Sequence, residues 1–187
     1  MSRRRPFKPL RRPVFVGCEG ESECGYASRV QDILREADVP VHLIIEDLGQ
    51  GAGDPLSRVE MAVRKLEHLR KTRGAPSDRF VLLDHDQTAA DPQRAIKACQ
   101  LAVAHNIQIV WQRPCFEAVL LRHLAGCVTR RPPDTTESER ALKREWPEYE
   151  KPMNRSKFAA KIGRAEILQA ATVEPELDAM LRSLGVM

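Results

Sequence analysis

The chain has 187 residues, a formal net charge of +4 and 42% hydrophobic residues. This length is enough for one well-buried domain. No apolar run approaches the length of about 18 residues that a membrane helix needs, and no apolar segment follows the charged N-terminus as in a signal peptide. We therefore expect a cytoplasmic protein that does not enter a membrane.

The positive charge is concentrated at the start of the chain. Residues 1–13 carry six Lys or Arg and no acid, so the remainder is slightly acidic. Basic arms of this kind are usually disordered and often contact nucleic-acid phosphate, but three prolines among these residues equally suit a solubilising leader. We predict a flexible basic arm over residues 1–12 and a folded domain over residues 13–187.

The five cysteines indicate reduced thiols. They are odd in number and scattered, and they contain no C-x-x-C pair that would suggest a redox motif or half of a zinc site. Cys115, His123 and Cys127 lie near one another in sequence, but their spacing matches no standard zinc pattern.

Strands and helices alternate in the first part of the chain. The order is a strand at residues 13–18, a helix at 26–37, a strand at 41–45, a helix at 56–69, a strand at 80–83, a helix from 91 to about 103 and a strand at 107–112. Such alternation predicts an α/β fold, with a parallel sheet over about 13–112 and helices on its faces.

The alternation stops after Gln112, and the remaining residues read as a helical extension over about 113–187. Apolar spacing predicts helices at about 114–125, 155–171 and 174–184, with a loop at 131–136 and a charged stretch around Trp146.

Acidic residues follow two of the predicted strands. Glu19 comes after the first strand, and Asp84 and Asp86 come after the third. In parallel sheets ligands bind outside the carboxyl ends of the strands, so the three acids are expected to share one crevice. Side chains alternate along a strand, so Asp84 and Asp86 are expected to point the same way and His85 the other way.

An all-carboxylate set predicts a site for Mg²⁺ or Mn²⁺. These cations prefer oxygen ligands, and a cation relieves the repulsion among neighbouring acids. Mg²⁺ held in this way usually takes further ligands from phosphate, so the expected chemistry is phosphoryl transfer or phosphodiester hydrolysis, with a carboxylate such as Glu19 as general acid or base. The alternative is that Glu19, Glu21 and Glu23 form a solvated turn and that Asp84 and Asp86 only cap a loop.

Four segments together resemble the RloB family of Toprim-like proteins. The glutamate motif with Tyr26 and the D-x-D motif resemble the two signatures of the Toprim fold, and a glycine-rich loop and a Pro-Cys-Phe-Glu segment also look like RloB. The glutamate motif is Val16–Glu23 and the D-x-D motif is Leu82–Asp86. The glycine-rich loop is Gly49–Pro55 and the Pro-Cys-Phe-Glu segment is Arg113–Glu117. The resemblance spans residues 13–171, most of the chain.

The resemblance implies Mg²⁺-dependent hydrolysis of a nucleic-acid phosphodiester, with Glu19 as the catalytic glutamate and Asp84 and Asp86 as metal ligands. RloB-like proteins are associated with bacterial antiphage defence and with a separate ABC-type ATPase, so DNA or RNA and such an ATPase are the expected partners. The rival interpretation is a non-catalytic component that binds nucleic acid or a partner protein. The sequence leaves homo-oligomer formation open.

Two other phosphate-related motifs are weaker. Asp84-His85-Asp86-Gln87-Thr88 also fits the D-x-D-x-T motif of haloacid-dehalogenase-type phosphatases, in which the first Asp is the nucleophile. That fold places the motif on its first strand and supplies a later acidic pair, whereas here no acid follows residues 107–112 before Glu117. The glycine-rich loop lacks the Gly-Lys-Ser or Gly-Lys-Thr of an ATP-binding loop.

Two further groups are candidate ligands. Glu117 is either a fourth acid at the metal or a residue whose charge favours the first turn of its helix. Lys157, Lys161 and Arg164 are spaced to share one face of the helix predicted over 155–171, where they would form a row of cations for a phosphate backbone. The alternative for the second group is an ordinary solvated helix face.

Overall fold

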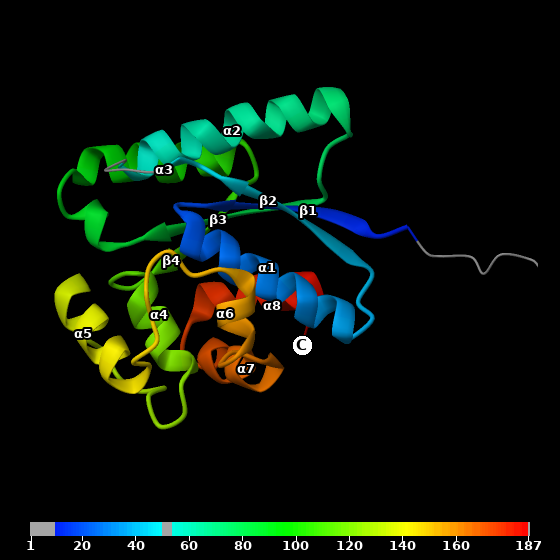
Figure 1. The fold of residues 1–187 in the computed structure, drawn as a ribbon. Coiled ribbons are helices and arrows are strands. Elements are labelled where there is room, and N and C mark those ends of the chain that lie inside the picture. Colours follow the sequence, from blue (N-terminus) through cyan, green and yellow to red (C-terminus); the bar gives the residue numbers. More distant parts are fainter. Residues whose placement is uncertain (1–9, 50–53, 187) are drawn as a thin grey trace, which may run out of the picture.

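A computed structural model describes residues 10–49 and 54–186, and in these residues it contains one sheet of four strands (Figure 1). The sheet order is β2-β1-β3-β4, and every neighbouring pair is parallel. The strands are β1 (Arg12–Cys18), β2 (Val41–Asp47), β3 (Asp78–Asp84) and β4 (Gln108–Gln112). The predicted α/β fold is confirmed.

Helices connect the strands and form most of the C-terminal part. They are α1 (Glu21–Glu36), α2 (Pro55–Thr72), the short 3₁₀ helix η1 (Asp86–Thr88), α3 (Pro92–Ala104), α4 (Phe116–His123), α5 (Thr135–Glu145), α6 (Arg155–Ala159), α7 (Arg164–Ala171) and α8 (Pro175–Leu184). No helix among the described residues has the length and apolar character needed to cross a bilayer. Residues 1–9 of the predicted arm and residues 50–53 of the glycine-rich loop lie outside the described residues.

The first helix begins earlier than the sequence pattern indicated, at Glu21 rather than near Tyr26. Gly20 is extended and acts as the N-cap, and Glu21 and Glu23 lie in the first turn, where negative charge is favoured by the helix dipole. The segment expected to be an acidic turn is therefore largely helical, and α1 starts directly beside the end of β1.

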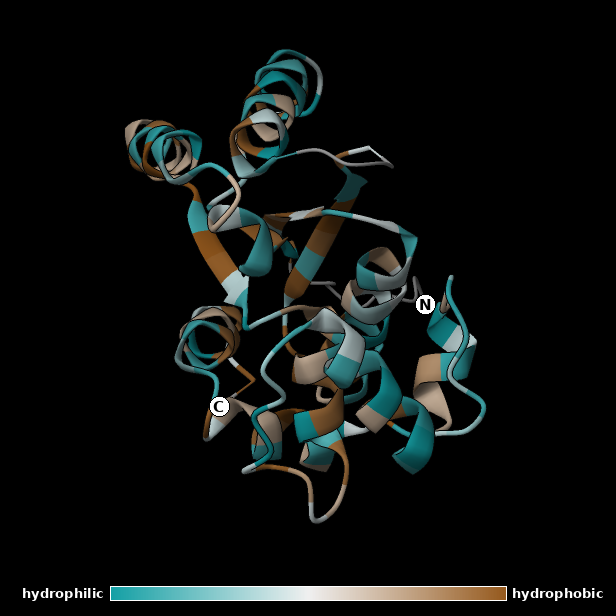
Figure 2. Ribbon diagram, turned by 90° about the vertical axis from the view of Figure 1, so that its left-hand side faces the viewer, coloured by the Kyte–Doolittle hydropathy of each residue, from teal (hydrophilic) through white to brown (hydrophobic). Residues whose placement is uncertain are grey.

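Side chains on opposite faces of the strands enter two separate apolar clusters. Phe15, Val81 and Leu83 pack with residues of α2 and α3, whereas Val14 and Leu82 pack with α1 and the C-terminal helices. Figure 1 shows the two helix layers on opposite sides of the sheet, and Figure 2 shows apolar residues along the strands between them. The C-terminal helices thus cover one face of the sheet, together with α1.

The prediction of a single helix over residues 155–171 is wrong. The structure ends α6 at Ala159 and starts α7 at Arg164. Gly163 is the extended N-cap of α7, and its N–H donates to Glu166 Oε2 over 2.9 Å. Ile162, which is buried, lies in the break. A cap and a buried side chain between the two helices replace the continuous helix.

A segment that we call the strap, residues 146–154, crosses the start of α1. Met153 N donates to Ser22 Oγ over 3.1 Å. The backbone fits closely at Gly25, where an added Cβ would lie 2.2 Å from Met153 O. Glycine at position 25 therefore permits the contact that fixes the strap against α1.

We predict that Gly25→Ala destabilises the protein by about 2 kcal/mol, because the added methyl overlaps a backbone oxygen that has little freedom to move. This cost exceeds the gain of about 1 kcal/mol that alanine brings to a helix. Denaturant unfolding followed by circular dichroism measures the change. Ser28→Ala, a small change on the same helix, is the control, and a Gly25→Ala variant as stable as the wild type would show that the strap is not fixed in this way.

Candidate functional site

The candidate site lies at the carboxyl ends of the two central strands. β1 and β3 are neighbours in the sheet, so Glu19, which follows β1, and Asp84, which ends β3, come together. Asp84 N donates to Glu19 Oε2 over 3.1 Å, and Gln87 Nε2 donates to Glu19 Oε1 over 2.6 Å. Both oxygens of the Glu19 carboxylate are thus positioned by residues at the end of β3.

Asp84 also contacts the segment that follows β4. Its Oδ1 accepts a hydrogen bond from the backbone N–H of Phe116, over 2.8 Å, at the first residue of α4. Three chain segments, after β1, β3 and β4, are thereby joined through two carboxylates.

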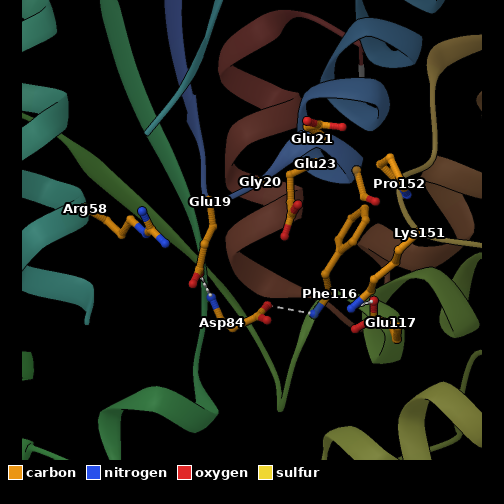
Figure 3. Close-up of a pocket in the computed structure, with 11 residues that line it drawn as sticks. Glu19, Gly20, Glu21, Glu23, Arg58, Asp84, Phe116, Glu117, Lys151 and Pro152 are labelled. Carbon is orange, nitrogen blue, oxygen red and sulfur yellow. Dashed lines mark hydrogen bonds and ion pairs between the residues drawn. The ribbon is translucent and has the colours of Figure 1, made fainter. Parts of the chain in front are cut away.

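A cleft of about 460 Å³ opens beside these acids (Figure 3). Figure 3 shows the Glu23 side chain pointing into the cleft from α1, while Arg58 extends toward it from α2 and Lys151 from the strap. The residues that line the cleft are Glu19, Gly20, Glu21, Ser22, Glu23, Arg58, Asp84, Phe116, Glu117, Lys151 and Pro152.

Asp86 does not line this cleft, and the expectation that it points the same way as Asp84 fails. β3 ends at Asp84, so strand alternation no longer applies beyond that residue. The backbone N–H groups of His85 and Asp86 both donate to Pro114 O, over 3.1 and 3.0 Å, and the chain turns into η1. The Asp86 side chain instead accepts a hydrogen bond from Thr135 Oγ1 of α5, over 2.5 Å.

Burial and neighbouring acids raise the pKa values of two acids in the cleft, Asp84 and Glu23. Burial, followed by the charges of Glu19 and Glu23, raises the pKa of Asp84 well above its ordinary value. Burial also raises the pKa of Glu23 to about 7, and the charges of Glu19 and Glu117 add to this shift. Neighbouring negative charge therefore adds to burial in disfavouring the ionised form of both carboxyl groups.

Glu117 is neutralised by the strap. Lys151 Nζ lies 2.5 Å from Glu117 Oε1, and the Tyr149 hydroxyl donates to the same oxygen over 2.7 Å. Burial opposes ionisation of Glu117, but the bond from Lys151 and that from Tyr149 outweigh it and lower its pKa. Within the described residues, Glu117 Oε2 is buried and accepts no hydrogen bond.

The cleft matches a divalent cation in charge and donor type. Its ligand atoms are carboxylate oxygens, which Mg²⁺ and Mn²⁺ prefer, and the buried Glu117 Oε2 lacks a partner. Glu19 and Asp84 are the residues that would hold such an ion. In residues 10–49 and 54–186, however, no three His, Cys, Asp or Glu side chains lie close enough to form a metal site as they stand.

The three basic residues predicted to form one row do not do so. The break between α6 and α7 separates Lys157 and Lys161 from Arg164. Lys157 and Lys161 border a depression beside Trp146 and Met153, and Arg164 Nη2 donates to Val186 O over 2.9 Å. None of the three lines the acidic cleft.

Sequence reasoning missed several residues of the cleft. Glu23 was considered only as part of a solvated turn, although its place four residues after Glu19 puts it on the first turn of α1. Arg58 is buried on α2, and its Nη1 donates to Leu48 O over 3.1 Å. Lys151 lies far along the chain, and no local pattern marks it, because only the packing of the strap on α1 brings it to the cleft.

Comparison with known proteins gives one match. The family model described as RloB-like protein matches residues 14–179, which is most of the chain and includes all the cleft residues. No curated protein and no solved structure matches the sequence. Because the family match extends over both the strands and the C-terminal helices, we conclude that this chain belongs to the RloB-like protein family.

Proposed function

We propose that this protein is a Mg²⁺- or Mn²⁺-dependent nuclease, or the nuclease subunit of an assembly, that hydrolyses phosphodiesters of DNA or RNA. The proposal is carried by the direct contact between Glu19 and Asp84, in a cleft where burial and the charges of neighbouring acids hold the pKa of Asp84 well above its ordinary value. Carboxylates gathered at the ends of parallel strands favour a divalent cation there. The other ligands of such a cation are commonly phosphate oxygens.

The cleft residues supply distinct functions in this proposal. A divalent cation in the cleft would stabilise negative charge on the attacked phosphate and lower the pKa of a bound water. Glu19 and Asp84 would hold the cation, and Glu19, fixed through Asp84 N–H and Gln87, is also placed to accept a proton. Glu23, with a pKa of about 7, exchanges a proton near neutral pH and is a second candidate for general acid or base.

Two positively charged side chains border the same cleft. Arg58 and Lys151 are positioned to contact a phosphate group there, from α2 and from the strap respectively. Lys151 now pairs with Glu117 and, over 3.2 Å, with Glu139 of α5. A phosphate entering the cleft would compete with these acids for the ammonium group.

Membership of the RloB-like family supports a role in antiphage defence and an ABC-type ATPase partner, because RloB-like proteins are associated with both. The same membership favours the nuclease over the phosphatase alternative. The absence of a complete ligand group among the described residues favours the rival proposal, a component that binds nucleic acid or the ATPase without cutting. The two proposals differ in whether cleavage depends on the acids of the cleft.

The first test is cleavage of DNA, RNA and tRNA by the purified protein in Mg²⁺ or Mn²⁺, with and without its ATPase partner. We expect Glu19→Gln and Asp84→Asn each to lower the cleavage rate by about a hundredfold or more, because both remove carboxylates that position the cation and the proton acceptor. Gel-resolved cleavage rates measure this effect.

Glu67→Gln is the matched control, because it removes an exposed acid of α2 outside the cleft. Cleavage that survives in the Asp84→Asn variant would show that the site is assigned wrongly. Binding of nucleic acid or ATPase without cleavage under any pairing would favour the non-catalytic alternative.

The second prediction concerns the stability of the cation-free protein as a function of pH. The pKa of Glu23 is about 7 in the fold, against 4.5 for the ordinary group, so the folded state binds its proton more tightly than the unfolded chain does. The contribution of this proton to the free energy of unfolding is fully present below about pH 4.5 and is lost as pH rises through about 7. Between about pH 5 and pH 8.5 we expect the wild type to lose about 2 to 3 kcal/mol more than Glu23→Gln does.

Urea unfolding in the presence of a chelator measures this difference at each pH. Glu21→Gln, which changes an exposed acid in the same helical turn, is the control. If the wild type and Glu23→Gln keep a constant difference in stability across the range, Glu23 does not carry the buried proton.

A further inference from the structure

Asp86 and Thr135 form a contact that separates the two aspartates of the D-x-D motif. Thr135 Oγ1 donates to Asp86 Oδ2 over 2.5 Å, and these residues are 49 positions apart in the chain. Asp84, by contrast, lines the acidic cleft and accepts from Phe116 N. The motif therefore places one carboxylate in the cleft and the other against the first residue of α5.

Capping of α5 does not require this contact. Asp134 is the N-cap of α5, and its Oδ1 accepts from Glu137 N over 2.8 Å. Its carbonyl oxygen also accepts from Ser138 Oγ over 2.6 Å. Because Asp134 already caps the helix, and because the bond to Asp86 comes from the Thr135 side chain, this bond acts as a tie between α5 and the turn after β3.

The backbone around Asp86 is fixed, so its side chain is the part free to turn. Asp86 N donates to Pro114 O over 3.0 Å, and η1 follows directly. Rotation about the Cα–Cβ bond moves a carboxylate between staggered positions without moving the backbone.

We propose that Thr135 is a positioning residue that holds the Asp86 carboxylate away from the cleft, and that Asp86 leaves Thr135 to complete the ligand set when a divalent cation binds at Glu19 and Asp84. This inference rests on the proposed cation site and adds a rearrangement to it. It would bring Asp86, which bonds to Thr135 in this structure, beside Glu19 and Asp84, whereas no three His, Cys, Asp or Glu side chains are grouped for a metal among the described residues.

The same helix links this rearrangement to the strap. α5 carries Thr135 at its start and Glu139 one turn later, and Glu139 pairs with Lys151 over 3.2 Å. Lys151 in turn pairs with Glu117 in the cleft. Release of Asp86 therefore acts on α5, the helix whose Glu139 also pairs with the Lys151 ammonium group beside the cleft.

Mn²⁺ affinity of the full chain, measured by titration calorimetry, tests the proposal. Thr135→Val removes the hydroxyl while keeping the shape of the side chain, so the Asp86 carboxylate no longer has to give up a hydrogen bond. We expect the Mn²⁺ dissociation constant to fall about fivefold, as expected for the loss of one competing hydrogen bond to an exposed charge. Thr135→Ser, which keeps a hydroxyl, should behave like the wild type.

Matched variants separate this proposal from the proposed function. Thr136→Val changes the adjacent threonine and should leave the dissociation constant unchanged. In the Thr135→Val background, Asp86→Asn should remove the whole gain. If the wild type binds Mn²⁺ through Asp84 but Thr135→Val binds no more tightly, the positioning role is wrong and the cation site stands. If neither protein binds Mn²⁺, both proposals fail.

Hydrogen exchange provides a readout that a purely structural contact would not change. We expect saturating Mn²⁺ to speed exchange of the amides of Glu137 and Ser138 in the wild type, because a helix start that is no longer tied to the turn after β3 opens more often. The acceleration should be absent in Asp86→Asn, where the ligand that leaves Thr135 is missing. Equal protection of these amides with and without bound Mn²⁺ would overturn the proposal.

Discussion

The parallel pairing of β1 with β3 is the constraint on which the candidate site depends. It places Glu19 beside the end of β3, where Asp84 N–H and Gln87 hold both of its carboxylate oxygens. The cost of this arrangement is negative charge in a confined space, visible in the raised pKa values of Asp84 and Glu23. Lys151 pairs with Glu117 in the cleft, and Asp86 lies outside the cleft, where it accepts a hydrogen bond from Thr135.

The sheet and the meeting of its central acids were predictable from sequence, because both follow from local patterns. Short apolar runs bounded by acids predict strands, and parallel strands of one sheet present their carboxyl ends at one edge. The direction of Asp86 was not predictable in the same way. Its expectation assumed that β3 continued through residue 86, whereas the backbone of His85 bonds to Pro114 O and ends the strand at Asp84.

The other differences arise from a local capping bond and from a contact between distant segments. A capping bond from Gly163 to Glu166 ends the helical periodicity that had suggested a row of three cations. Lys151 reaches the cleft only because Met153 packs on Gly25 and Ser22, more than a hundred residues earlier in the chain. Periodicity describes one element at a time, so neither a cap within an apparent helix nor a contact made by the strap is visible in it.

The close contact of the strap with α1 has a consequence for the order in which this protein is made. A ribosome that has translated β1 to β4 has already produced Glu19 and Asp84, but not yet the strap that carries Lys151 or the α5 hydroxyl that holds Asp86. Domains of this size generally fold as units. The cleft is thus completed only when the C-terminal third emerges. A truncated nascent chain contains Glu19 and Asp84 but lacks Lys151, which pairs with Glu117, and Thr135, which bonds to Asp86.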